Sequence, residues 1–142
     1  MKIAKSVAAA LAVGLALMFT PLSYADQAAE EAAVAAAQQW LALVDEGKYG
    51  DSWEQAAEFF KGALTKRQWE EALNGVRRPL GKVLSRSMSG KQFATSLPGA
   101  PDGKYVVIQF QTSFEGKKSA VETVTPMLDK DGKWRVSGYY IK

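Results

Sequence analysis

The spacing of apolar residues changes once along the chain, near Gly81, and this change limits the folds that are available. Before Gly81, apolar residues recur every three or four positions, as on one side of a helix. After it, short segments alternate between apolar and polar residues, as along strands that have one covered face. Helices followed by consecutive strands predict an α+β fold, with helices on one face of an antiparallel meander sheet.

Three helices are predicted in the first half of the chain. Residues 27–46 are mostly strong helix formers, and Gly47 follows where a left-handed glycine would end the helix. Ser52–Gln55 has the pattern of a capping box, which predicts that Ser52 opens a short second helix. Thr65–Gln68 has the same pattern and predicts the start of a third helix, which should end before Pro79.

About four strands are predicted in the second half. They are residues 82–96, interrupted near Ser89-Gly90, and residues 105–114, 119–129 and 133–141. Each strand follows its predecessor after a short turn, which is typical of an antiparallel meander. Residues 26–142 are therefore predicted to form one domain, in which the long first helix crosses a curved sheet and gives it the shape of a cone.

A turn at Asp131-Gly132 sets the register of the last two strands. Asp-Gly is favoured in two-residue hairpin turns. A turn of that length would place Thr125 opposite Gly138 and Met127 opposite Val136.

The loop of the preceding hairpin decides on which face of the sheet Glu122 lies. We expect an even number of loop residues, which would place Phe110 opposite Thr123. Glu122 and Tyr139 would then share the polar, uncovered face of the sheet, while Tyr140 would point to the core. A slip of one residue would instead move Glu122 into the apolar layer.

The first 25 residues have the three parts of a secretory signal peptide. Lys2 and Lys5 give a positive start, Val7–Phe19 is apolar, and Ser23–Ala25 has small residues at the cleavage positions. A membrane anchor is the alternative, but this apolar run is shorter than the roughly 20 residues that span a bilayer. No Cys follows it for lipid attachment. We expect cleavage before Asp26, a periplasmic or secreted location, and no membrane attachment afterwards.

The composition excludes several kinds of chemistry. The chain contains no His and no Cys, which removes the Ser-His-Asp triad, Cys nucleophiles and the usual zinc, copper and haem ligands. We therefore expect no metal, no cofactor and no assigned catalytic residue. After cleavage, 16 Lys and Arg remain against 15 Asp and Glu, so we expect no binding of nucleic acid.

Four residues are candidates for ligand binding: Arg78, Arg86, Glu122 and Tyr139. The two arginines lie in the most basic segment, and their planar guanidinium groups suit a carboxylate, a phosphate or a sulfated group. Alternatively, one arginine pairs with Glu122 or another acid, and the others are solvated. The arginines considered as partners of Glu122 are Arg78, Arg86 and Arg135. Glu122 interrupts an otherwise apolar and Thr-rich strand. Tyr139 would lie on the open sheet face, where aromatic residues favour an interface.

Several groups of residues occur together and in a fixed order: Asp45-x-Gly47-x-Tyr49-x-x-Ser52-Trp53, Trp69, Arg78-Pro79-Leu80-Gly81 with Arg86, Leu97-Pro98-Gly99-x-Pro101-x-Gly103-x-Tyr105, Glu122-x-Val124-x-Pro126, and Asp131-Gly132-x-Trp134-x-Val136-x-Gly138-Tyr139. In combination they resemble the bacterial exported family known as domain of unknown function 4019. The resemblance covers nearly all of the chain after residue 25.

This resemblance implies no assigned activity. It implies the cystatin-like cone that nuclear-transport-factor-like (NTF2-like) and ketosteroid-isomerase-like proteins share, a fold that hosts enzymes, binding modules and dimerisation domains. Enzymes of the ketosteroid-isomerase-like group usually use Asp and His, and this chain has no His.

The preferred functional hypothesis is an exported, non-catalytic binding or interaction module. We expect a homodimer that forms through the uncovered sheet face, with a small anionic molecule or a peptide as ligand. The alternative hypothesis is a cofactor-free hydrolase or isomerase that uses Glu122 as its general base. A pocket beneath the helices that contains Glu122 would favour the alternative.

Overall fold

The computed structural model describes residues 24–142 of the chain. The apolar run Val7–Phe19, on which the signal-peptide prediction depends, lies outside these residues. Within residues 24–142, no helix is both long enough and apolar enough to cross a membrane.

The first half of the described chain is helical, as predicted, but it contains four α-helices and not three. They are α2 (Tyr24–Asp45), α3 (Tyr49–Glu54), α4 (Glu58–Ala63) and α5 (Lys66–Val76), followed by the 3-10 turn η1 (Arg78–Leu80). The capping box of Thr65 and Gln68 is present at the start of α5, as predicted.

The predicted capping role of Ser52 is wrong. Ser52 lies inside α3, is fully buried, and donates its hydroxyl to the backbone oxygen of Tyr49 at 2.6 Å. The chain then turns before α4, where the N–H of Ala57 donates to the backbone oxygen of Val136 at 2.9 Å. This contact with a distant strand replaces a helical hydrogen bond, and the predicted second helix is therefore divided into α3 and α4.

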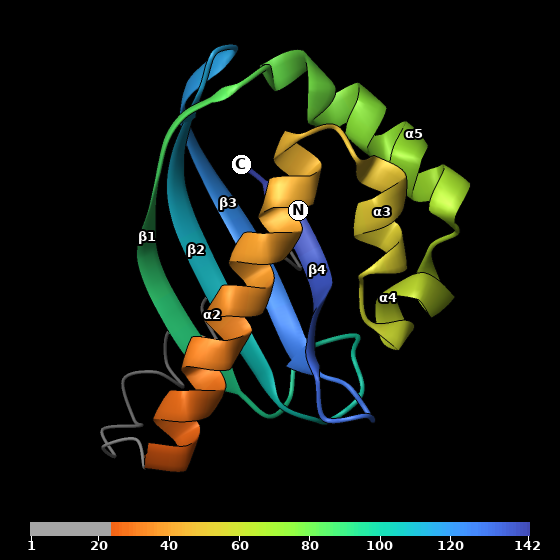
Figure 1. Cartoon of the computed structure of the whole chain (residues 1–142), viewed down its shortest axis with the longest axis vertical. Helices are drawn as coiled ribbons and strands as arrows, with labels where there is room; N and C mark the ends of the chain where they lie inside the picture. The colour runs from red at the N-terminus through yellow and green to blue at the C-terminus, as the bar shows by residue number, and fades with distance from the viewer. Residues whose placement is uncertain (1–23) are drawn as a thin grey trace.

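The second half forms one antiparallel sheet with the strand order β1-β2-β3-β4 (Figure 1). Its strands are β1 (Val83–Ala94), β2 (Tyr105–Phe114), β3 (Lys117–Leu128) and β4 (Trp134–Ile141). The predicted α+β class and four-stranded meander are confirmed. The interruption predicted near Ser89-Gly90 is also present, as a bulge between Met88 and Gly90 in β1.

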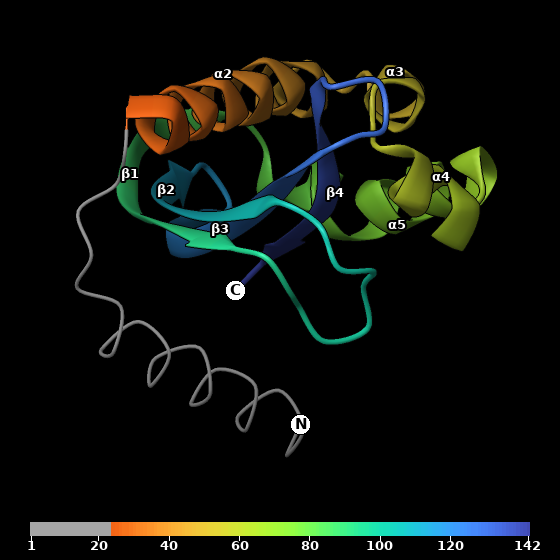
Figure 2. The same ribbon diagram turned by 90° about the horizontal axis from the view of Figure 1, so that it is seen from below.

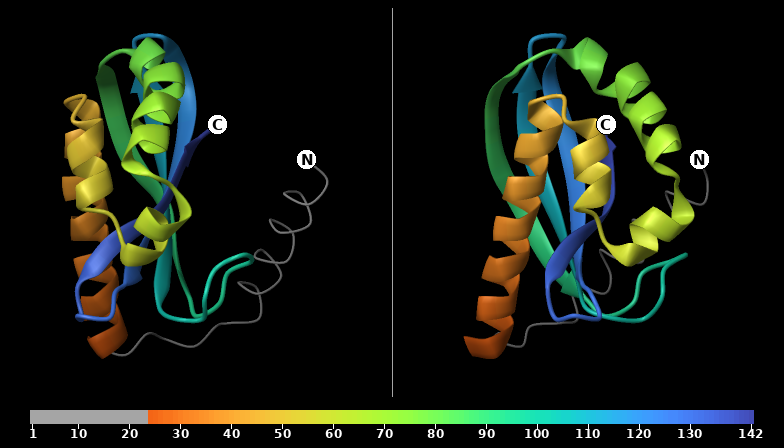
Figure 3. Two further views of the ribbon diagram at one scale, coloured as in Figure 1. Left: turned by 90° about the vertical axis from the view of Figure 1, so that its right-hand side faces the viewer. Right: turned by 45° about the vertical axis from the view of Figure 1, so that its right-hand side comes forward.

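The helices gather on one side of the sheet. Helix α2 crosses this side, and α3, α4 and α5 continue it beside β4 (Figure 2). Further views show the same arrangement, with α2 lying along the sheet and α3, α4 and α5 grouped next to it (Figure 3). In the described part of the chain, no helix covers the opposite face of the sheet.

An aromatic cluster forms the centre of the core. Trp40 of α2 packs against Trp69 of α5, with ring centroids 6.0 Å apart, and against Tyr139 of β4 at 5.2 Å. Phe60 of α4 meets Trp69 edge to face at 4.9 Å. Such aromatic pairs contribute more to stability than the area that they bury would account for. The cluster therefore joins three helices to the last strand.

The register between β2 and β3 differs from the prediction, and a bulge is the reason. The hairpin loop does hold an even number of residues, because Phe114 pairs with Lys117. Between Thr112 and Phe114, however, β3 contains one residue more than β2. Phe110 therefore pairs with Glu122 and not with Thr123. One extra residue exchanges the two faces of the remaining strand.

This exchange corrects the predicted positions of three side chains. Glu122 lies in the apolar layer, fully buried, and Tyr139 is on the same side because it pairs with Val124. Tyr140, predicted to point to the core, is 59% exposed. The uncovered sheet face therefore carries Tyr140, and the predicted placement of Glu122 and Tyr139 on that face is wrong.

In the last hairpin, two deviations from the predicted register compensate each other. The Asp131-Gly132 turn is closed by a hydrogen bond from the N–H of Asp129 to the oxygen of Lys133, so its loop holds three residues. A bulge between Thr125 and Pro126 then compensates, and Thr125 pairs with Gly138 as predicted. Before the bulge is reached, Met127 pairs with Arg135, so the predicted pairing of Met127 with Val136 is wrong.

Candidate functional site

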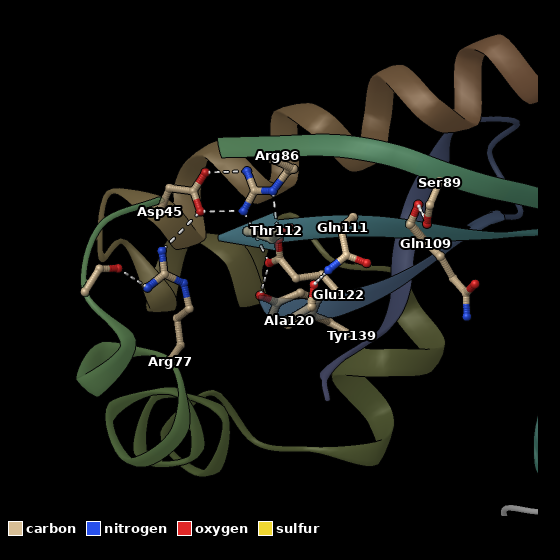
Figure 4. A network of polar contacts seen from close by, with 11 residues as sticks. Asp45, Arg77, Arg86, Ser89, Gln109, Gln111, Thr112, Ala120, Glu122 and Tyr139 are labelled. Atoms are coloured by element: carbon tan, nitrogen blue, oxygen red, sulfur yellow. Dashed lines mark hydrogen bonds and ion pairs between the residues drawn. The ribbon is translucent and has the colours of Figure 1, made fainter. Parts of the chain in front are cut away.

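Glu122 of β3 is the centre of a buried polar network (Figure 4). Arg86 of β1 donates through Nε to Oε1 of Glu122 at 2.7 Å and through Nη2 to Oε2 at 3.2 Å. The hydroxyl of Thr112 on β2 donates to Oε1 at 2.6 Å, and the hydroxyl of Tyr139 on β4 donates to Oε2. Each strand of the sheet thus contributes one side chain, and both carboxylate oxygens have two donors.

The network continues to the end of α2. Arg86 also donates to both oxygens of Asp45, at 2.7 and 2.9 Å. Arg77, at the end of α5, donates to Asp45 at 3.3 Å and to the backbone oxygen of Gly81 at 2.6 Å. The Arg77 side chain is 3% exposed and lies over the ring of Phe114. Two arginines and two acids balance one another, which is how buried charges are normally tolerated.

The surroundings shift the pKa of two members of the network. Burial lowers the pKa of Arg86, but hydrogen bonds to Asp45 and Glu122 and the charges of both acids outweigh this effect and raise it. Burial raises the pKa of Tyr139, and the negative charge of Glu122 and the hydrogen bond to it raise it further. The nearby charges of Arg77 and Arg86 oppose this rise. At neutral pH Arg86 is therefore charged and Tyr139 is protonated.

Three of the four candidate residues come together in this network, namely Arg86, Glu122 and Tyr139. The alternative in which one arginine pairs with Glu122 is thus the arrangement observed, and that arginine is Arg86. The fourth candidate, Arg78, lies apart: its Nε donates to Asn74 at 2.7 Å, and its guanidinium lies over the ring of Tyr49. Arg78 is exposed and has no ion pair with any described residue.

Asp45, Arg77 and Thr112 belong to the network but were not among the candidate residues predicted from the sequence. One signal was present for Thr112, because it alternates with Ile108 and Phe110 on the face predicted to be apolar. Most buried hydroxyls have a hydrogen-bond partner. That tendency favours the register in which Glu122 lies on the same face. Asp45 and Arg77 have no comparable signal, because their contacts join residues far apart in the sequence.

A groove of about 510 Å³ lies between α2, α3 and the start of β4. Helix α2 contributes Gln39 and Trp40, and α3 contributes Asp51 and Glu54. From the other side come Lys133, Trp134, Arg135 and Val136. The groove thus combines an apolar floor, where Trp40 and Val136 are buried, with charged groups of both signs. None of the four candidate residues from the sequence analysis lines it.

The uncovered sheet face is neutral along its middle. Gln109 and Gln111 of β2 and Tyr140 of β4 are exposed on it. Between them lies Thr123, which is 6% exposed and whose hydroxyl has no hydrogen-bond partner in the described structure.

Within residues 24–142, no three or more acidic side chains gather in a way that could hold a metal ion. The family model described as "Protein of unknown function (DUF4019)" matches residues 36–139, which contain the whole buried network and the groove. A search of curated proteins gave no match.

Proposed function

The chain belongs to the DUF4019 family, and we propose that it is a binding module without catalysis of its own. We further propose that the protein is exported to the periplasm or the exterior, and that it assembles into a homodimer. Its fold is proposed to be of the cystatin-like, NTF2-like type. The proposed ligand is a small anionic molecule or a peptide.

The arrangement around Glu122 is the observation that carries the proposal. A general base must offer a free lone pair to a proton of the substrate at hydrogen-bond distance. Arg86, Thr112 and Tyr139 already donate four hydrogen bonds to the two oxygens of Glu122, whose side chain is fully buried. The carboxylate is thus used within the fold, which favours the non-catalytic hypothesis over the hydrolase or isomerase.

The same arrangement narrows the choice of residues for an anionic ligand. An anion that bound Arg86 would have to displace Asp45 or Glu122, and it would leave a carboxylate without its partner. Arg78 has no such competitor, because its charge faces solvent without an ion pair in the described structure. Of the four candidates, Arg78 is the residue that we propose for direct contact with an anion.

An activity assay tests the absence of catalysis. We expect the purified protein to release nitrophenol from p-nitrophenyl acetate and p-nitrophenyl phosphate no faster than buffer does. Turnover that disappears in Glu122→Gln, and that persists in the surface variant Glu71→Gln, would contradict the proposal and support the hydrolase.

Intact-mass analysis tests the proposed export. When the full chain is expressed in a Gram-negative host, we expect the protein in the periplasmic fraction to have the mass of residues 26–142. Recovery of the full-length chain from the cytoplasm alone would contradict export.

A further inference from the structure

We propose that the groove between α2, α3 and β4 binds a short peptide with free termini, held by Asp51 at its ammonium end and by Lys133 at its carboxylate end. This inference rests on the proposed function as a binding module. It adds the site and the class of ligand.

The walls of the groove are fixed before any ligand enters. The indole N–H of Trp40 donates to the backbone oxygen of Ser52 at 2.8 Å and holds α2 against α3. The hydrogen bond from Ala57, at the start of α4, to Val136 holds the segment that follows α3 against β4. The volume of about 510 Å³ is in the range of small-molecule sites, which are commonly formed in advance. Binding of a ligand therefore requires no free energy to order these walls.

The charges of the groove are of two kinds, paired and unpaired. Glu54 is paired with Lys66 at 3.0 Å, and Arg135 is paired with Asp129 and Asp131. Asp51 and Lys133 are exposed, and neither side chain has an ion pair or a hydrogen bond with a described residue. The charge of Asp51 helps to raise the pKa of Lys48 and of Lys66, but Asp51 forms no ion pair with either lysine.

A ligand with both charges fits these two groups better than a simple anion does. An anion beside Lys133 would gain one favourable contact but would share the groove with the carboxylates of Asp51 and Glu54. A peptide with free termini offers an ammonium to the helix α3 side and a carboxylate to the β4 side. Capture of peptide termini is a recurring mode of recognition.

The remaining lining suits the middle of a peptide. The side-chain amides of Gln39 and Gln55 have no hydrogen-bond partner among the described residues, and an amide both donates and accepts. They match the N–H and C=O groups of a peptide backbone. Trp134 is half-buried and, with Leu43, offers an apolar surface to one side chain.

Isothermal titration with the tripeptide Ala-Phe-Ala tests this inference. The unmodified peptide should bind, and N-acetylation or C-amidation should each weaken binding by about two- to fivefold, as expected for one exposed ion pair. Asp51→Asn should weaken binding of the unmodified peptide by a similar factor, and Lys133→Gln likewise. N-acetylation of the peptide should not weaken its binding to Asp51→Asn any further, because the contact between the ammonium group and Asp51 is already lost.

The matched control variants are Asp102→Asn and Lys118→Gln, which neutralise exposed charges away from the groove and should not alter binding. Absence of saturable binding overturns the inference, and so does affinity that is insensitive to both terminal modifications. Failure here is distinct from failure of the proposed function. A bound tripeptide that is hydrolysed, as seen by mass spectrometry, would support the groove and contradict the non-catalytic proposal.

Discussion

At the scale of single residues, Glu122 shows how a charge can be used inside a small core. The carboxylate is fully buried, yet each of its oxygens accepts two hydrogen bonds, and Arg86 balances its charge. Removal of one member of such a pair is costly, because the other charge stays buried without compensation. An ion pair of the same kind contributes little to stability when it lies on the surface, because water solvates both groups.

We therefore expect Glu122→Gln to lower the free energy of unfolding by about 3 kcal/mol. The reason is that Arg86 would keep only Asp45 as a charged partner. Urea titration followed by circular dichroism measures the change. The control is Glu71→Gln, which breaks the exposed pair with Arg67 and should cost less than about 0.5 kcal/mol. Equal stability of the two variants would show that the network does not stabilise the fold.

At the scale of elements, the turn between β2 and β3 is fixed against η1. The N–H of Gly116 donates to the backbone oxygen of Leu80 at 2.8 Å, and that of Glu115 donates to Lys82 at 3.0 Å. This contact holds the hairpin end next to the bulge that places Glu122 in the core. It also requires a residue without a side chain, because a Cβ on Gly116 would lie 2.8 Å from the backbone oxygen of Pro79.

Gly116→Ala should accordingly destabilise the protein by about 1–3 kcal/mol, the usual cost of overpacking, since the obstacle is backbone and cannot rotate away. Gly90→Ala is the matched control in β1. A Cβ there would have no neighbour within 4 Å, so its effect should stay within about 0.5 kcal/mol. Thermal unfolding of both variants, followed by circular dichroism, measures the difference. A Gly116→Ala variant as stable as Gly90→Ala would show that η1 yields at little cost.

At the scale of the whole molecule, the helices within residues 24–142 leave one sheet face uncovered, and its neutral middle can meet a second copy without repulsion between like charges. Amides and tyrosine, which are present there, suit an interface. A two-fold axis would bring each residue near its counterpart or a neighbour of it. This geometry supports the proposed homodimer. It also indicates that a charge introduced on the uncovered face should prevent dimerisation.

Analytical ultracentrifugation should therefore give a dimer for residues 26–142. Tyr140→Lys should weaken dimerisation by at least about tenfold, which is about 1.4 kcal/mol. Phe59→Lys, which places the same charge on an exposed aromatic position of α4, should leave the dimer intact. A monomer at all concentrations, or equal effects of the two variants, would contradict the assignment of this face.

The pH dependence of stability is a second property of the whole molecule. With no His in the chain, no side chain has an ordinary pKa between pH 5 and 8, so stability should be nearly constant there. Above pH 10 the unfolded chain releases the proton of Tyr139, whereas the folded protein retains it because its pKa is raised. The contribution of Tyr139 to the free energy of unfolding is thus fully present below pH 10. Above pH 10 it falls by up to about 1.4 kcal/mol per pH unit.

Urea titrations between pH 6 and 11 test this expectation, with Tyr139→Phe as the comparison. That variant loses the hydrogen bond to Glu122 and should be less stable at pH 7, but its stability should fall less steeply above pH 10. Parallel curves for the two proteins would show that Tyr139 does not cause the alkaline loss.

Local signals in the sequence determined much of this fold. The helix formers of α2, the capping box at Thr65 and the alternation along β2 act within a few residues, so their effects can be read without knowledge of the rest. These signals gave the α+β class and the strand order. They also placed Arg86, Glu122 and Tyr139 on strands that the structure contains.

Only the tertiary structure decided how those residues meet. The bulge between Thr112 and Phe114 adds one residue to β3, and a strand has two faces, so this small change moved Glu122 and Tyr139 from the surface to the core. The groove, too, exists only where α2, α3 and β4 converge. Contacts between residues 30 or 40 positions apart depend on the geometry of the whole chain, and no local pattern encodes that geometry.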